Sequence, residues 1–591
     1  MVDAIDILVA ATPLFVVGFL LVGLLWPATR AMPIAWLSAL VVGYLVWEVP
    51  VAWLVAATIE GVIVAVQILW IVFGALVLLY TMLRAGAFTA LNRGFAEISE
   101  DRRVQVVLLA FFLSTLIEGA AGFGTPAAVV APLLLGLGFP ALAAVVAALI
   151  GHIIAVTYGA VGTPIIVGIV EPMAGVSGIQ GSLAEEGMTA NEFGVNVAAW
   201  AATYHALVGF LMPLFTVGMV VYFFGEERSI EPALEAWPLC LFAGVAFAVP
   251  YWAAAWFISA EFPALIGATV GATVVVGTLR AGYLHPEGEW EFPPREEWPD
   301  HWNGSIHPTD VRTALETDAP VSFLRAWSPY LVLLVLLVVT RTVEPLSALL
   351  QGESVRILQR TVSTTLGTAE TGVGEFTVGL LRFEWTSILG TGIDNGIDFT
   401  YVPGMWLLVS ALACLPIFGL SARSAASAWV EAARKLLSPL IALVFVLAMV
   451  QVMLQSGAHA EDVDSMIVVL ATATAGALGP AYPFAAALIG ALGAALVGSN
   501  TVSNLTFGPF QFVAAETLGI SRELIVGAQA VGGAIGNLVA IHNVVAALAT
   551  VGLVGQEGRV IRLNLIPLAY YTIVAGIWTV LFVYVLFPDV F

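Results

Sequence analysis

The sequence predicts an all-α polytopic integral membrane protein, with about 12–14 transmembrane helices in two inverted halves and with discontinuous or re-entrant segments. Hydrophobic residues make up 60% of the 591 residues and charged residues only 10%, whereas a soluble domain has about 25% charged residues. Apolar stretches of the length that crosses a bilayer, about 20 residues, recur along nearly the whole chain. Glycine and polar clusters interrupt some of these stretches and predict broken helices.

The first apolar stretch, residues 7–26, has no basic leader and no small-residue cleavage site. It is therefore expected to be a retained first helix and not a signal peptide. Arginines follow the first span and crowd residues 81–103, so the positive-inside rule places the N-terminus outside and residues 81–103 in the cytoplasm. The acidic stretch 171–195, which has no basic residue, then lies outside.

Two long polar interruptions, residues 281–326 and 343–401, divide the chain. We predict an N-terminal transmembrane half at 1–280, a cytoplasmic acidic loop at 281–326 and a C-terminal transmembrane half at 327–591. Such a division is typical of transporters built from two structural repeats.

Composition excludes several classes of function. The formal net charge is −21, and Lys435 is the only lysine beside nineteen arginines. This pattern predicts a halophile, although a GC-rich genome would also replace lysine by arginine, and it argues against nucleic acid as a partner. Cys240 and Cys414 lie far apart in apolar runs and are interpreted as packing residues. No metal site and no cofactor are expected.

Glu118 is the only charged residue between Val104 and Val170. A carboxyl group within a span costs about 2.5 kcal/mol or more, which favours a functional role. Helix-breaking residues follow it directly: Gly119, Gly122, Gly124 and Pro126, with Thr125 among them. We expect a discontinuous helix or re-entrant hairpin whose amides bind an anion, with Glu118 carrying a proton or coordinating a cation. Alternatively, Glu118 lies at a membrane surface and the glycines only allow close helix packing.

A second polar cluster lies in the other half, within VGSNTVSNLTFGPFQF. Its candidate substrate-binding residues are Ser499, Asn500, Thr501, Ser503 and Asn504. Hydroxyl and amide side chains suit a carboxylate or sodium, and one break in each half indicates a shared site near the membrane midplane. The alternative is a polar turn outside the membrane.

Isolated polar residues in other spans are further candidates. His152, Asn537 and His542 are predicted to take part in ion coupling, although a lone histidine is more often a hydrogen-bonded core residue, which is how we interpret His205. Arg382, Glu384 and Asp394 either enter the site or remain in a solvated loop.

Several separate strings resemble the lactate permease family. They are IEGAAGFGTP (117–126), GLGFPALAA (136–144), FLRAWSPYLVL (323–333), LRFEWTSILGTG (381–392), GSNTVSN (498–504), VGGAIG (531–536) and ALATVGLVGQE (547–557). The resemblance implies a secondary transporter with alternating access around a site between two halves, and it marks Glu118 as the family's buried glutamate. The chain departs from the family pattern at Asn500, where an aspartate is usual, and at Asn537, where a lysine is usual.

The predicted function is therefore symport of L-lactate, or of a similar short 2-hydroxy-monocarboxylate, across the plasma membrane with H⁺. Another organic or inorganic anion, or Na⁺ coupling, is the alternative, and homo-oligomer formation is left open. A redox-driven proton pump subunit is disfavoured because such proteins use lysines within their spans. A membrane enzyme is disfavoured because no nucleophile–base pair, paired acids or His-metal spacing is present.

Overall fold

The structure is a computed structural model that describes residues 4–24, 26–122, 124–306, 321–351, 355–357, 360–380, 382–460, 463–553 and 555–590. Among these residues, ten helices are long and apolar enough to cross a membrane, and three bent helix pairs raise the number to as many as 13. The protein is a multi-pass membrane protein, and this range overlaps the predicted 12–14 spans. The first predicted span is one of the bent pairs, Ala4–Ala10 and Thr12–Leu21, which meet at 48°.

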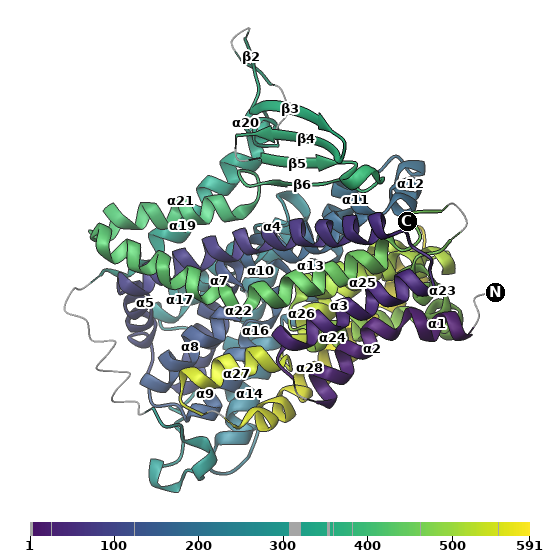
Figure 1. The fold of residues 1–591 in the computed structure, drawn as a ribbon. Coiled ribbons are helices and arrows are strands. Elements are labelled where there is room, and N and C mark those ends of the chain that lie inside the picture. The colour runs from purple at the N-terminus through teal and green to yellow at the C-terminus, as the bar shows by residue number, and fades with distance from the viewer. Residues whose placement is uncertain are drawn as a thin grey trace.

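One group of helices, here called the scaffold body, combines the start of the chain with part of the C-terminal half (Figure 1). It comprises α1 (Ala4–Ala10), α2 (Thr12–Gly18), α3 (Ala28–Leu45), α4 (Val51–Arg84), α5 (Ala87–Ala96), α19 (Phe323–Thr342), α20 (Glu344–Leu350), α21 (Pro403–Phe418) and α22 (Ala422–Gln455). Glycines on α4 let its neighbours approach closely. A Cβ at Gly61 would lie 2.5 Å from the backbone of Ala448 on α22. Small residues at such crossings strengthen helix packing in a membrane.

The remaining helices form a second group, the core body. They are α6 (Arg102–Gln105), α7 (Ser114–Ala121), α8 (Thr125–Gly136), α9 (Ala141–Gly151), α10 (Gly159–Ile165), α11 (Glu171–Gly175), α12 (Ser177–Glu185), α13 (Ala190–Gly209), α14 (Met212–Phe224), α15 (Glu231–Glu235), α16 (Trp237–Phe257), α17 (Pro263–Arg280), α23 (Met466–Leu478), α24 (Tyr482–Val497), α25 (Asn500–Leu518), α26 (Arg522–Gly536), α27 (Ile541–Thr550) and α28 (Glu557–Leu581). The π-helical segments are Phe19–Gly23, Val106–Leu113, Ile166–Val170 and Phe582–Leu586, and the 3₁₀ helices are Ile153–Tyr158, Arg295–Glu297, Asp300–Trp302, Ile388–Gly390 and Gly479–Ala481.

The segment predicted as a polar interruption at 343–401 carries β-strands outside the helical membrane part. They are β1 (Val355–Ile357), β2 (Arg360–Val362), β3 (Thr365–Thr371), β4 (Gly374–Gly379), β5 (Arg382–Thr386) and β6 (Asn395–Asp398), with β3–β6 forming one antiparallel sheet in chain order. Phe376 pairs with Trp385 across the β4–β5 ladder, with ring centroids 4.7 Å apart. The sheet rests on α4, where the Trp70 indole N–H donates to the Phe399 carbonyl at 3.1 Å. These strands were not expected from the sequence, which predicted an all-α protein.

The molecule has two ends, which we name from the segments that lie there. The sheet end carries β3–β6 and α12, and the loop end carries residues 281–306 and α5 (Figure 1). Within the predicted acidic loop, residues 281–306 pack against the core body: Trp302 is buried, and the Ser305 amide donates to the Gly552 carbonyl at 2.8 Å. Residues 307–320 of that loop lie outside the described residues. Both cysteines are buried and free.

Two helical hairpins enter the core body from opposite ends. In the first, α8 folds back along α7 and residues 106–113, and its base lies at the loop end, where the Arg102 guanidinium lies over the Phe139 ring. In the second, α25 folds back along α24. Its base lies at the sheet end, where the Ser182 hydroxyl of α12 contacts the Glu516 carboxylate.

Each hairpin is followed by a broken span that runs toward the opposite end of the molecule. Residues 141–175 cross from the loop end to the sheet end, and residues 522–550 cross the other way. The hairpin of each half packs against the broken span of the other half. The α8 helix contacts α27, and α25 contacts α10 and residues 166–170. The order of hairpin and broken span is thus repeated with inverted orientation, and this arrangement brings both hairpin tips to the middle of the core body.

Candidate functional site

The tip of the first hairpin is a break between α7 and α8. Gly122 and Gly124 have φ angles of +60° and +73°, a left-handed backbone that glycine adopts without strain. The Thr125 hydroxyl donates to the Gly122 carbonyl at 2.7 Å, and Pro126 occupies the first turn of α8, where a missing N–H does no harm. The predicted helix break at 119–126 is therefore present as a re-entrant tip.

The tip of the second hairpin lies between α24 and α25. Gly498 ends α24 with φ +74°, and the Ser499 hydroxyl caps α25 by accepting from the Val502 amide at 3.4 Å. A glycine and then a capping hydroxyl is a standard way to end one helix and start another. The polar cluster of the C-terminal half is thus a second tip within the membrane part.

The broken span after the first hairpin repeats the chemistry of the first tip. Ala160, Val161 and Gly162 all have positive φ angles, of 44°, 57° and 76°. Gly162 is followed by Thr163 and Pro164, so Gly-Thr-Pro occurs at both breaks. The Thr163 hydroxyl donates to the Ala160 carbonyl at 2.6 Å, which matches the bond made by the first tip's threonine.

The broken span after the second hairpin interrupts the helix at residues 537–540. The Asn537 amide group donates to the Gly533 carbonyl at 3.0 Å, and the Asn543 amide group donates to the Asn537 carboxamide oxygen at 3.0 Å. Asn537 thereby ties the end of α26 to the start of α27.

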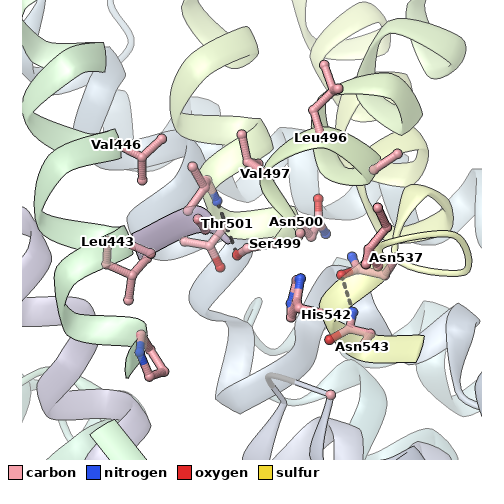
Figure 2. Close-up of a pocket in the computed structure, with 18 of the residues that line it drawn as sticks. Leu443, Val446, Leu496, Val497, Ser499, Asn500, Thr501, Asn537, His542 and Asn543 are labelled. Carbon is pink, nitrogen blue, oxygen red and sulfur yellow. Dashed lines mark hydrogen bonds between the residues drawn. The ribbon is translucent and has the colours of Figure 1, made fainter. Parts of the chain in front are cut away.

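These four breaks enclose a cavity of about 650 Å³ together with residues from α3 and α22 of the scaffold body. Figure 2 shows Leu443 and Val446 of α22 across from Ser499 and Thr501, and His542 between Ser499 and the Asn537–Asn543 pair. Three helices begin at the cavity, α8, α25 and α27, and their N-terminal dipoles favour an anion there.

Glu118 is the only charged side chain among the described residues that line the cavity, and no lysine or arginine joins it. It is 3% exposed, and its Oε2 lies 3.9 Å from Nε2 of His152 without any hydrogen-bond partner among the described residues. The Nδ1 of His152 is engaged with the Ala148 carbonyl at 2.7 Å. The carboxyl group also lies close to the Gly159 backbone, since a Cβ there would be 2.3 Å from Oε1.

Two glycines allow close contact between the hairpin tips and the start of α27. A Cβ at Gly124 would lie 2.5 Å from the Asn543 carboxamide oxygen. A Cβ at Gly498 would overlap the His542 ring. The tips can therefore meet the start of α27 only because these positions have no side chain.

Most predicted site residues lie at the cavity. The residues that line it are Glu118, Gly122, Gly124, His152, Ser499, Asn500, Thr501, Asn537 and His542. Four other predicted residues do not line the cavity. Gly119 packs against Ala264, and the Thr125 hydroxyl donates within its own tip. The Ser503 hydroxyl donates to the Gly490 carbonyl at 2.9 Å, and the Asn504 amide group donates to the Pro164 carbonyl at 3.0 Å. Asn504 thus joins the second hairpin to the first broken span.

Some candidates lie elsewhere. Arg382 and Glu384 form an ion pair at 3.1 Å in the sheet, and the Asp394 carboxylate accepts from the Ser387 amide, so this trio lies outside the cavity. His205 is a buried core residue, as interpreted, between Thr157 and Tyr571. Two parts of the site were not expected from the sequence, residues 159–163 and Asn543. The repeated Gly-Thr-Pro triplet was the signal for the first of these.

Comparison with known proteins identifies the family of the chain. A family model described as L-lactate permease matches residues 6–586, nearly the whole sequence. The chain belongs to the L-lactate permease family. It is 28% identical over 521 residues to the L-lactate permease of Salmonella typhimurium, covering 87% of this chain and 84% of that protein. It is 27% identical over 532 residues to the glycolate permease GlcA of Escherichia coli, covering 86% of this chain and 84% of that one.

Two solved structures also align with this member of the L-lactate permease family. MtrF of Neisseria gonorrhoeae, from a study of antimetabolite efflux pumps, gives a TM-score of 0.39 at 16% identity, covering 87% of this chain and 81% of that chain. The YdaH transporter of Alcanivorax borkumensis gives a TM-score of 0.38 at 16% identity, covering 89% and 86%.

Proposed function

We propose that this protein is a secondary active symporter that moves L-lactate, or a similar short 2-hydroxy-monocarboxylate, together with H⁺. Relatives across most of the chain are named L-lactate and glycolate permeases. The observation that carries the proposal is the cavity between two re-entrant tips, in which Glu118 is the one charged side chain among the described lining residues.

The substrate carboxylate binds, in this proposal, where α8, α25 and α27 begin. Helix N-termini attract one negative charge without a fixed cation, through backbone amides and the helix dipole. The hydroxyl groups of Ser499 and Thr501 and the ring of His542 line the same space. A monocarboxylate fits this site, whereas a dicarboxylate would bring a second charge that no lysine or arginine of the described lining offsets.

Glu118 carries the coupled proton. An ionised Glu118 repels a bound carboxylate, and protonation removes that repulsion, so anion and proton each raise the other's affinity. The unpartnered Oε2 can hold the proton without breaking a hydrogen bond made by the described residues. His152, at 3.9 Å, and His542 are the neighbouring groups that assist the coupling.

Sodium coupling is the second candidate. Asn500 favours it, because both polar atoms of its carboxamide are buried without a hydrogen-bond partner among the described residues. An amide oxygen is a suitable sodium ligand. Asn537, by contrast, has both its amide and its oxygen engaged.

The location and orientation of the protein in the cell are also proposed. The protein is expected in the plasma membrane, with the loop end in the cytoplasm and the N-terminus outside, and the cavity between the two transmembrane halves opens alternately to either side. Homo-oligomer formation is left open by the fold. The acidic, lysine-poor composition supports a halophilic source.

The experiment is uptake of labelled L-lactate by proteoliposomes that contain the purified protein, with a pH gradient and a sodium gradient imposed separately. Uphill uptake driven by protons alone is expected. We expect Glu118→Gln to abolish accumulation but to retain lactate exchange at equal pH, since a permanently neutral side chain still accepts the anion. Unchanged pH dependence in Glu118→Gln refutes its role, and accumulation driven only by sodium favours the second candidate.

A further inference from the structure

The scaffold and core bodies meet at a sparse boundary. Contacts within each body are dense, as between α4 and α22 or between α24 and α26, whereas the contacts across the boundary, which are mainly those of α1 with α23 and of α4, α21 and α22 with the core helices, are sparse. The cavity lies on this boundary, because Met32, Leu443 and Val446 come from the scaffold body while the four breaks come from the core body. Movement of one body against the other would therefore open or close the cavity.

Among the polar contacts that side chains of the described scaffold body make with the helical core, three lie close to the first broken span and α11. The Arg341 Nε lies 2.6 Å from Oε1 of Glu261. The Gln67 amide group donates to Oε1 of Glu171 at 2.9 Å, and the Gln455 amide group donates to the Gly175 carbonyl at 3.1 Å. All three lie at the sheet end, where α19, α22 and the first half of α4 adjoin the sheet or α11.

The Arg341–Glu261 pair is the charged member of this set. Both side chains are at least nine-tenths buried, and the guanidinium also lies 3.9 Å above the Tyr401 ring. Its Nη1 is buried without a hydrogen-bond partner among the described residues. Removing one partner of a buried ion pair leaves the other charge uncompensated, so the contact between the two bodies is sensitive to replacement of either residue.

Glu261 is in turn connected to the site. Its turn packs behind the first broken span, since a Cβ at Gly162 would lie 2.5 Å from the Ala260 carbonyl oxygen and 3.0 Å from Cα of Glu261. The same turn leads into α17, whose Ala264 packs on Gly119. A change at the ion pair therefore reaches both breaks of the first half.

The cavity itself extends toward the loop end. Its lining follows α27 from Ile541 to Ala546 and includes residues 26–29 at the start of α3, but it includes none of the three polar contacts. The α27 helix ends at Thr550, and the turn after it carries the Gly552 carbonyl, which accepts from the Ser305 amide at the loop end. The described state is thus closed at the sheet end, where the polar contacts lie.

We propose that Arg341 and Glu261 are further residues of the transport cycle, which latch the core body to the scaffold body and keep the cavity closed at the sheet end. The contacts of Gln67 and Gln455 support the latch. The inference rests on the proposed transport function, because opening at the sheet end has to break the ion pair once per cycle.

The test measures the sidedness of the cavity without any substrate. Cys240 and Cys414 are replaced by alanine, Val446→Cys is introduced in the cavity wall, and a membrane-impermeant maleimide is applied to vesicles of either orientation. We expect labelling from the loop end in the parent. Glu261→Gln, which keeps shape but removes charge, is expected to raise the labelling rate from the sheet end at least fivefold, and Arg341→Gln to do the same.

A matched control exists within the scaffold body. Arg84 and Glu431 form an ion pair of the same 2.6 Å length between α4 and α22, and it does not cross the boundary. Glu431→Gln should leave the labelling unchanged. The exchanged pair Arg341→Glu with Glu261→Arg should restore the low labelling from the sheet end, which a merely misfolded protein would not do.

Unchanged sheet-end labelling in both single variants, with loop-end labelling retained, overturns the latch. If Glu261→Gln does not reach the membrane, Glu261→Asp, which weakens the pair by lengthening it, gives the same readout. Absence of lactate uptake by the unaltered protein overturns the proposed function instead, and it leaves the labelling result standing.

Discussion

Replacing Gly159 with alanine tests whether the position of the Glu118 carboxyl group is what the transport site requires. The backbone at Gly159 has φ −61° and ψ 154°, which alanine adopts freely, so the effect is purely steric. The new Cβ would lie 2.3 Å from Oε1 of Glu118 and 3.2 Å from its Cδ. Ordinary contact begins near 3.4 Å, so the carboxyl group has to move by about 1 Å.

Overpacking of this kind costs about 1–3 kcal/mol in a close-packed interior. At 1.4 kcal/mol per factor of ten, we expect Gly159→Ala to lower the ratio kcat/KM for L-lactate uptake by about 5- to 150-fold. The assay is initial uptake in proteoliposomes, with the amount of inserted protein measured in parallel. Gly181→Ala on α12, where a Cβ meets nothing within 4 Å, is the matched control and should transport normally.

A double-mutant cycle isolates the cause. In a Glu118→Ala background the clash is absent, so Gly159→Ala should have little effect on the temperature at which the detergent-solubilised protein unfolds. In the parent it should lower that temperature. Equal losses in both backgrounds, or normal uptake by Gly159→Ala alone, would refute the argument that this glycine positions Glu118.

Two other predictions follow from the tip and from the sheet. Gly498→Ala should lower lactate uptake at least tenfold, because it combines φ +74° with overlap of the His542 ring. In the sheet, burial raises the pKa of Asp398 to about 6, although Arg382 opposes this shift. The folded sheet therefore binds the proton of the Asp398 carboxyl group more tightly than the unfolded chain does, and the resistance of the sheet to proteolysis should fall as pH rises from 4 to 6. Asp398→Asn should remove this pH dependence. A resistance that rises between pH 4 and 6 in the unaltered protein would contradict the prediction.

The membrane part of the fold could be predicted because long apolar stretches directly indicate transmembrane spans, and helix-breaking residues within those stretches indicate the hairpin tips. Glu118 stands out for the same reason, since a lone charge in a long apolar stretch needs a function. The sheet could not be predicted as easily. Its strands are short, and pairs such as Phe376 and Trp385 become visible as partners only once the ladder is formed.

The broken span at residues 159–163 shows a different limit. Ala160 and Val161 have positive φ angles, which local propensity disfavours, and a β-branched residue in this region is an outlier. Surrounding structure has to impose this conformation, and the tight packing of Gly162 on the Ala260 carbonyl is part of that structure. Because the cause lies about 100 residues away in the sequence, only the Gly-Thr-Pro repeat could have indicated it.

The charges of the cavity link the fold to the choice of cargo. Each half supplies one tip and one break, yet the only ionisable acid of the described lining, Glu118, comes from the first half, while the second contributes Ser499, Thr501 and the Asn537–Asn543 pair. Helix N-termini can hold one anionic charge, but they cannot also balance an ionised Glu118. In the proposed mechanism a bound carboxylate therefore requires a cation to arrive with it, and a cavity without lysine or arginine in its described lining would be suited to symport and poorly suited to uniport of an anion.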